Sequence, residues 1–248
     1  MKQFLFVTDL DNTLVGDDEA LAVLNQKLSK HRQAYGTKIV YATGRSRALY
    51  QELQKEKQLI EPDALVAAVG TEIYYPDTEN PNSEWEETLC QGWHRETVFA
   101  IAAQFSALVP QPASEQSLFK ISFFIEKEAA FEILPKLEKL FQEKGLRVQM
   151  IYSSERDLDL LPERANKGFA MQFLRSKWGI SSTHTVVCGD SGNDIALFSV
   201  GDERGIIVGN AQPELLHWHN ANPAPHRYLA KAHFAAGILE GLKYFGFL

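Results

Sequence analysis

The sequence has little cysteine and no long apolar run. Only two cysteines, Cys90 and Cys188, occur in 248 residues, which is too few for the disulfide framework of a small secreted scaffold. No run of about 18 apolar residues is present, and the first apolar run ends in carboxylates without a small-residue cleavage site. We therefore expect a cytoplasmic protein with free thiols and no membrane segment.

Basic residues are also in the minority. Lys and Arg number 25 against 32 Asp and Glu, which gives a formal net charge of −7. No segment gathers the cations into a stripe that could neutralise a nucleic-acid backbone, so nucleic acid is excluded as the expected partner. Long repeat arrays are lacking too, which excludes a solenoid. The 45% hydrophobic content is that of a globular protein with a full-sized core.

Five short apolar runs, each followed by polar or glycine residues, divide the outer parts of the chain. They cover residues 4–7, 38–42, 64–69, 184–188 and 205–208. Segments of helical length and periodicity lie between most of them. The alternation of buried strand and helix predicts an α/β fold with a doubly wound, mostly parallel sheet.

The middle of the chain breaks this alternation. The expected elements there are, in chain order, a helix over 86–108, a strand over 119–125, a helix over 128–145 and a strand over 147–153. Pro135 indicates either a kink in the second helix or a later start. The pattern predicts a small α+β module over residues 84–156, inserted into a discontinuous core of residues 1–83 and 157–248.

Acidic residues follow two of the predicted strands, at the edge where open α/β sheets bind ligands. Asp9 and Asp11 are two residues apart, so both carboxylates can point to one side, where a cation or a proton must offset their repulsion. Asp190 and Asp194 follow the fourth strand. Together they are the hard oxygen ligands that Mg²⁺ prefers. The alternatives are a turn or capping role for Asp11 and a helix-dipole role for Asp194.

Residues after the other strands suggest an anionic substrate. Thr43 and Gly44 offer a hydroxyl and a backbone N–H that can hold an oxyanion. Arg45 offers a fork for a phosphate or for a nearby carboxylate. Lys167 stands at the expected start of a helix, where the helix dipole disfavours a cation, so its position calls for a neighbouring anion. The alternative for each of these residues is an ordinary turn or surface position without a role in binding.

Two other types of site remain to be weighed. The sequence Gly-Asp-Ser-Gly around Ser191 resembles the core of trypsin-like serine proteases, but none of the seven histidines follows a predicted strand, and such a nucleophile needs one beside it. His217 and His219 invite a zinc interpretation. Two histidines at i,i+2 without further ligands nearby are instead typical of a partly buried helix end.

Four motifs, in this order, resemble those of the haloacid-dehalogenase-type phosphatases. They are DLDNT (9–13), ATGR (42–45), NKG (166–168) and GDSGND (189–194). The resemblance implies that Asp9 is the nucleophile that forms an aspartyl-phosphate. It also implies that Asp11 is the acid that protonates the leaving oxygen and then the base that activates water, which agrees with the two-carboxylate pattern.

The same resemblance implies the ligands of the metal and of the phosphate. Mg²⁺ would be held by the Asp9 carboxylate, the backbone carbonyl of Asp11 and Asp190. Asp194 would either bind it through water or orient Lys167. The residues expected to hold the phosphoryl oxygens are Thr43, Gly44, Lys167 and Asn193.

The inserted module resembles the C2-type cap of this family, which selects the leaving group. Within the family, the stretches LDLLPERANKG, CGDSGNDIALF, VGNAQPELLHW and GILEGLKYF are similar to the sucrose-phosphate phosphatases of cyanobacteria and plants. This likeness implies an enzyme that hydrolyses sucrose 6-phosphate. We expect it to be a monomer. The residues expected to contact the sugar are Arg45, Lys120, Glu115 and Gln116.

Composition and spacing name no disaccharide, so alternatives stay open. One is a phosphatase of trehalose 6-phosphate or of a phosphorylated mannosylglycerate, and another is a phosphomutase. A third is a non-catalytic sugar-phosphate-binding partner of sucrose-phosphate synthase, against which the presence of both Asp9 and Asp11 argues. In the catalytic interpretation, that synthase is the candidate protein partner.

Overall fold

The structure, a computed structural model, describes residues 2–153 and 155–248. The chain divides into two compact units. Unit 1 consists of Met1–Asn82 and Asn166–Leu248, and unit 2 of Ser83–Ala165. Among the described residues, no helix combines the length and the apolar character needed to cross a membrane.

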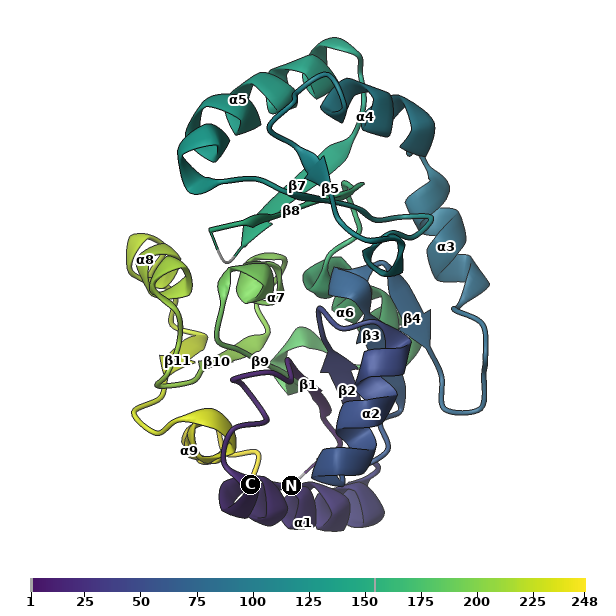
Figure 1. The fold of residues 1–248 in the computed structure, drawn as a ribbon. Helices are drawn as coiled ribbons and strands as arrows, with labels where there is room; N and C mark the ends of the chain where they lie inside the picture. The colour runs from purple at the N-terminus through teal and green to yellow at the C-terminus, as the bar shows by residue number, and fades with distance from the viewer. Residues whose placement is uncertain (1, 154) are drawn as a thin grey trace. The chain divides into compact units, whose positions relative to one another are not determined.

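A seven-stranded sheet runs through the described residues of unit 1 (Figure 1). In spatial order its strands are β11 (Arg227–Leu229), β10 (Arg204–Ile207), β9 (Thr185–Gly189), β1 (Leu5–Thr8), β2 (Lys38–Ala42), β3 (Ala64–Ala67) and β4 (Glu72–Tyr74). All neighbours pair in parallel except β3 and β4. The chain winds outward from β1 in one direction and from β9 in the other. The predicted doubly wound, mostly parallel sheet is therefore confirmed, with its switch point between β1 and β9.

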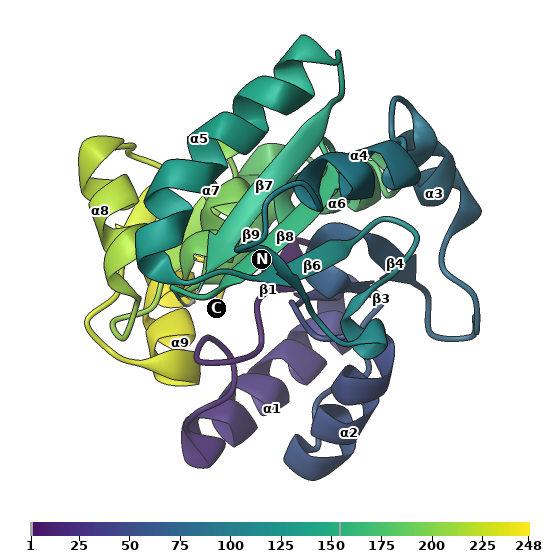
Figure 2. The same ribbon diagram turned by 45° about the horizontal axis from the view of Figure 1, so that its top comes forward.

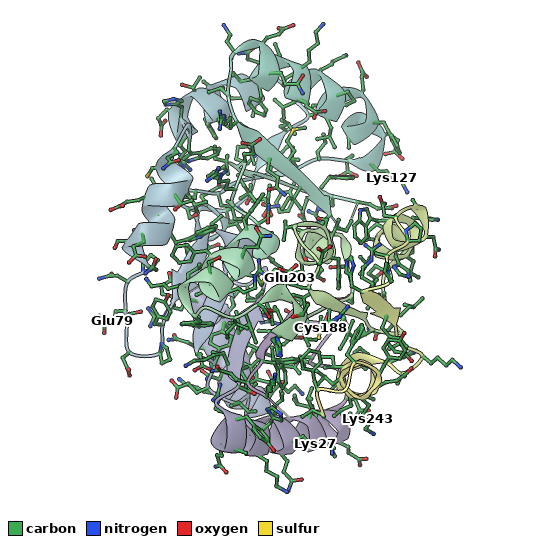
Figure 3. All side chains as sticks on the ribbon, turned by 180° about the vertical axis from the view of Figure 1, so that it is seen from behind. Lys27, Glu79, Lys127, Cys188, Glu203 and Lys243 are labelled. Atoms are coloured by element: carbon green, nitrogen blue, oxygen red, sulfur yellow. The ribbon has the colours of Figure 1, made fainter. Side chains whose placement is uncertain are left out.

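Helices cover both faces of this sheet (Figure 2). They are α1 (Asp18–Tyr35), α2 (Arg47–Lys57), α6 (Lys167–Lys177), α7 (Ile195–Ser199), α8 (Pro213–Ala221) and α9 (Phe234–Tyr244). Phe6 points into an apolar cluster formed with α1, α2 and α9, whereas α6 and α7 contact β3 and β9 outside that cluster. Burial on both faces explains why the strands read as unbroken apolar runs. Cys188 lies inside this unit (Figure 3), and neither cysteine is paired.

Unit 2 is built on an antiparallel sheet. Its strands, in spatial order, are β5 (Val109–Pro110), β6 (Ile121–Phe124), β8 (Asp157–Pro162) and β7 (Val148–Ser153), and its helices are α3 (Ser83–Cys90), α4 (Arg95–Ala102) and α5 (Lys127–Glu143). Helix α5 starts before Pro135 and continues through it, so the later start is wrong.

Two expectations for unit 2 are wrong. The single helix over 86–108 is two helices, α3 and α4. The chain between them passes through Gly92, whose φ of +78° is not a right-handed helical conformation. The boundary after residue 156 falls too early because β8 pairs with both β6 and β7. Strand β8 therefore belongs to the inserted unit, which extends to Ala165.

Candidate active site

Lys167 joins three of the predicted site residues. Its Nζ donates to Oδ1 of Asp9 at 2.7 Å, to Oδ1 of Asp194 at 2.7 Å and to Oδ1 of Asn193 at 2.8 Å. Lys167 and Asp194 are fully buried, and Asp9 is 5% exposed. The end of β1, the turn after β9 and the start of α6 thus meet at the switch point of the sheet.

The start of α6 is fixed by local sequence. The side chain of Asn166 caps the helix by accepting from the backbone N–H of Phe169 at 2.9 Å, so Lys167 is its first residue. Gly70, with a φ of +101°, packs against this point. A Cβ at position 70 would lie 2.3 Å from the backbone carbon of Asn166. Only glycine allows this approach.

Asp194 is engaged through both of its oxygens. Oδ1 accepts from Lys167, and Oδ2 accepts from the backbone N–H groups of Asp190 at 3.0 Å and Ser191 at 3.1 Å. Ser191 and Asp194 form a capping box at the short 3₁₀ turn Gly192–Asp194. Ser191 is therefore a helix-capping residue, and among the described residues no histidine hydrogen-bonds to it. Gly189 is required here because a Cβ would lie 2.5 Å from the Asp194 Cβ.

Asp190 is held by a residue whose role the sequence did not reveal. The hydroxyl of Thr13 donates to Oδ1 of Asp190 at 2.7 Å, and both residues are buried. Thr13 closes the DLDNT motif, and that place in the motif is the signal that could have identified it. Oxygens of Asp9, Asp190 and Asp194 lie within 4.8 Å of one another, which makes this a candidate site for a divalent cation.

The electrostatics of the cluster show a shortage of positive charge. Burial raises the pKa of Asp9 to about 8, and the nearby Lys167 offsets this only in part. Burial and then the charge of Asp194 raise the pKa of Asp190 to about 6. Burial alone would lower the pKa of Lys167, but Asp194 and Asp9 outweigh it and hold that pKa above its usual range. With all three carboxylates ionised, Lys167 balances one negative charge and leaves two. A divalent cation would balance these two.

Asp11 lies apart from this cluster and faces Arg45. The Arg45 guanidinium makes two hydrogen bonds to its carboxylate, from Nε to Oδ2 at 2.7 Å and from Nη2 to Oδ1 at 2.8 Å. A carboxylate is one of the two partners that the sequence allowed for Arg45, and Asp11 takes that place. Both side chains keep contact with solvent, at 31% exposure for Arg45 and 46% for Asp11.

The turn after β2 brings Thr43 and Gly44 to the same edge. Thr43 is buried, and its hydroxyl oxygen accepts from the backbone N–H of Arg45 at 3.1 Å. Gly44 faces Asn193, since a Cβ at position 44 would lie 3.9 Å from its Nδ2. The residues expected to hold phosphate are therefore neighbours in space, with Asn193 linking this turn to Lys167.

In unit 2, the expected sugar contacts also lie together. The Lys120 Nζ is 3.6 Å from Oε2 of Glu115 and 3.7 Å from Oδ1 of Asp159. Burial raises the pKa of Asp159, although Lys120 and a 2.6 Å hydrogen bond from Ser122 oppose the shift. The side-chain amide of Gln116 makes three hydrogen bonds to the backbone, two to Ser122 and one to the carbonyl of residue 111. Gln116 thus stabilises this segment.

The two histidines on either side of Trp218 lie on α8. Among the described residues, neither joins a cluster of three or more metal-binding side chains. Burial lowers the pKa of His219, which fits the partly buried helix end that the sequence suggested.

The fold and the cluster define the class of protein. The buried Asp–Lys cluster at the switch point of a doubly wound sheet carrying an inserted unit is the arrangement of the haloacid dehalogenase-like hydrolases. A solved sugar phosphatase of subclass IIB of that superfamily has the same fold, with a TM-score of 0.69, 20% identity, and coverage of 99% of this chain and 100% of that chain. The sequence model of the sucrose-6F-phosphate phosphohydrolase family matches residues 2–246. The chain belongs to this family.

Two relatives are much more similar. The crystal structure of the sucrose-phosphatase from Synechocystis sp. PCC6803, in complex with sucrose and phosphate, is 44% identical with a TM-score of 0.91, over 99% of this chain and 98% of that chain. Probable sucrose-phosphatase 2 of Arabidopsis thaliana is 41% identical over an alignment of 251 positions, which covers 98% of this chain. This chain spans only 60% of the length of that plant protein.

Proposed function

We propose that the protein hydrolyses sucrose 6-phosphate to sucrose and phosphate through an aspartyl-phosphate on Asp9. The observation that carries the proposal is the buried group of three carboxylates around one lysine, in a chain of the sucrose-6F-phosphate phosphohydrolase family. The similar Synechocystis protein was crystallised with sucrose and phosphate, which are the products of this reaction.

Asp9 and Asp11 would divide the two chemical steps. Lys167 binds Oδ1 of Asp9, and no hydrogen bond from the described residues reaches Oδ2. Oδ2 would attack phosphorus, form the acyl phosphate and release the sugar oxygen. Asp11 would donate a proton to that oxygen and then remove one from the water that hydrolyses the intermediate. The position of Asp11 two residues after Asp9, outside the buried cluster, supports this division.

The residues around Asp9 would stabilise the transferring phosphoryl group. Lys167 and Asn193 offer donors on one side, and Thr43 with Gly44 on the other. Because both oxygens of Asp194 are already engaged, we assign it the orientation of Lys167.

The residues present fit Mg²⁺. Asp9 and Asp190 offer carboxylate oxygens and Asp11 a backbone carbonyl, all of them hard ligands, and the cluster lacks positive charge. When bound, the ion would neutralise these carboxylates and offset the charge of the phosphate. Thr13 would keep Asp190 in place for this task through its 2.7 Å hydrogen bond.

Unit 2 would select the sugar. Lys120 and Glu115 are the polar side chains there that we assign to the sugar hydroxyls. Gln116 would act through the backbone of its own segment, and Arg45 through Asp11. The rest of the proposal is a monomeric, cytoplasmic enzyme, with sucrose-phosphate synthase as the supplier of substrate and candidate partner.

The test is a panel of sugar phosphates assayed for phosphate release with Mg²⁺. The panel contains sucrose 6-phosphate, trehalose 6-phosphate, a phosphorylated mannosylglycerate and glucose 6-phosphate. We expect the highest kcat/KM for sucrose 6-phosphate. A preference for another sugar phosphate would change the proposed substrate but not the proposed mechanism. If no phosphate is released from any of them, both the substrate and the mechanism are contradicted.

A further inference from the structure

The loop that carries Asp11 contains an unusual backbone conformation. Asn12 has a φ of +58°, in the left-handed region, which few residues other than glycine, asparagine and aspartate adopt. The turn is tight, because the carbonyl of Leu10 accepts from the N–H groups of Leu14 at 3.0 Å and Val15 at 2.9 Å. Asp11 immediately precedes the left-handed Asn12, so the direction of the Asp11 side chain depends on this turn.

One side chain holds the turn from outside. The Nδ2 of Asn210 donates to the backbone carbonyl of Asn12 at 2.7 Å, and its Oδ1 accepts from the backbone N–H of Phe234 at 2.9 Å. Asn210 follows β10 in the stretch VGNA. Both ends of its amide are engaged, and they link the Asp11 loop to the start of α9.

The second anchor is unusual as well. Phe234 has a φ of +48°, which is a rare conformation for a bulky residue. Its ring packs on Gly16, where a Cβ would lie 2.4 Å from Cδ1 of the ring. The Asn210 amide thus hydrogen-bonds to the backbones of two left-handed residues, and a required glycine packs against the ring of one of them. Such conformations persist only where the surroundings determine them, and they concentrate at functional sites.

We propose that Asn210 is a positioning residue for phosphate transfer, which acts by fixing the Asn12 turn and hence the direction of the Asp11 carboxylate. The inference rests on the proposed function, in which Asp11 handles the proton of the leaving oxygen. Loss of the amide donor frees the Asn12 carbonyl and lets the loop relax, while Asp9 and Lys167 keep their hydrogen bond to each other.

This role predicts a dependence on the leaving group. An alkyl leaving group, such as the oxygen of a sugar, needs a proton in the transition state, whereas an aryl oxide leaves readily without one. A misplaced Asp11 therefore slows a sugar phosphate more than an aryl phosphate. A residue that only supports the fold would slow both substrates alike.

The experiment compares Asn210→Asp and Asn210→Ser with Asn222→Asp. Asn210→Asp keeps the acceptor for Phe234 and loses the donor, and the serine variant is a check on the added charge. Asn222 is the matched control because its Nδ2 also donates to a backbone carbonyl, that of Trp218 at 2.8 Å, in the same unit. The substrates are sucrose 6-phosphate and p-nitrophenyl phosphate, and hydrogen exchange is followed over residues 10–16.

For both Asn210 variants we expect kcat on the sugar phosphate to fall about tenfold or more, with KM within about twofold of the original. The aryl phosphate should lose several times less, and exchange over residues 10–16 should speed up. The control variant should match the original protein. Equal losses on both substrates, or unchanged exchange in folded Asn210 variants, would overturn the inference.

Failure of the proposed substrate is distinguishable from failure of this inference. If the original protein prefers another sugar phosphate, that compound replaces sucrose 6-phosphate in the comparison. If it hydrolyses no phosphate ester, the exchange measurement alone decides whether Asn210 holds the loop, and the assignment of a catalytic consequence is then wrong.

Discussion

Each unit contains a buried lysine among carboxylates. The two lysines, Lys167 and Lys120, differ in how closely the carboxylates hold them. Lys167 in unit 1 uses its three donors at 2.7 to 2.8 Å. Lys120 in unit 2 lies 3.6 and 3.7 Å from its two carboxylates, beyond hydrogen-bond distance. Lys167 is thus held by short hydrogen bonds, whereas Lys120 is held by longer ion pairs. The difference supports chemistry in unit 1 and selection in unit 2.

The strongest test of the comparison is Asp9→Asn, which removes the carboxylate that Lys167 holds. We expect phosphate release to fall by more than about a thousandfold because the nucleophile is lost. The fold should remain, since an asparagine oxygen can still accept from Lys167. Phosphate release measures the effect, and circular dichroism checks the fold.

The matched control is Asp159→Asn, which removes a buried carboxylate beside Lys120 instead. Its loss of kcat on an aryl phosphate should be small, because Asp159 belongs to the unit that we assign to sugar selection. Substantial turnover by Asp9→Asn would contradict the covalent mechanism, and a total loss in Asp159→Asn would remove the distinction between the units.

Removal of divalent metal should affect only the carboxylate cluster of unit 1, and through it the release of phosphate. With EDTA we expect phosphate release to disappear, and Mg²⁺ to restore it, because the cluster leaves negative charge that Lys167 does not balance. The aryl phosphate should respond as the sugar phosphate does. Activity that is indifferent to EDTA would contradict the metal site.

Lys120→Met tests the assignment of sugar selection to unit 2, and its expected effect is smaller. It should raise KM for the sugar phosphate about tenfold, which is the value of one hydrogen bond from a charged donor. KM for a small aryl phosphate should change little. Steady-state kinetics on both substrates measure the split. Lys127→Met is the control, since Lys127 is a solvent-exposed lysine of the same unit that pairs with Glu155. Equal changes on both substrates would place Lys120 outside sugar selection.

The sequence predicted the parts of the fold in which local pattern and burial agree. The five central strands of unit 1 were found because strands covered on both faces read as apolar runs. The edge strands β4 and β11 were missed because each has three residues. Strand β8 (Asp157–Pro162) alternates polar and apolar residues only over its first four positions, and nothing local shows which sheet it joins.

For the site, sequence predicted which residues gather but not all of their pairings. Asp9, Lys167 and Asp194 could be brought together because each follows a strand or starts a helix at the same edge. The Thr13–Asp190 and Arg45–Asp11 hydrogen bonds depend on side-chain directions set by turns. Asn210 lies two residues after the last of the predicted strands. Its bond to a carbonyl 198 residues away leaves no local pattern.

The smallest expected effect that distinguishes the Lys167 site from the Lys120 site concerns protein stability. It is the pH dependence with which Mg²⁺ stabilises the folded protein. Without metal, the raised pKa values of Asp9, about 8, and Asp190, about 6, mean that the folded state binds more protons than the unfolded chain. These groups therefore contribute stability that is complete below pH 3.8 and is lost as pH rises toward about 8. Mg²⁺ must displace the same protons, so its stabilising effect should grow over that interval.

Unfolding midpoints measured with and without Mg²⁺ between about pH 5 and 8 should diverge by a few degrees as pH rises. Asp190→Asn should weaken this divergence because it removes one of the raised carboxyl groups. Lys120→Met should preserve it, since none of the described residues of unit 2 belongs to the cluster. A divergence that does not change with pH would mean that Mg²⁺ does not compete with protons on Asp9 and Asp190, and the shortage of positive charge would then need another explanation.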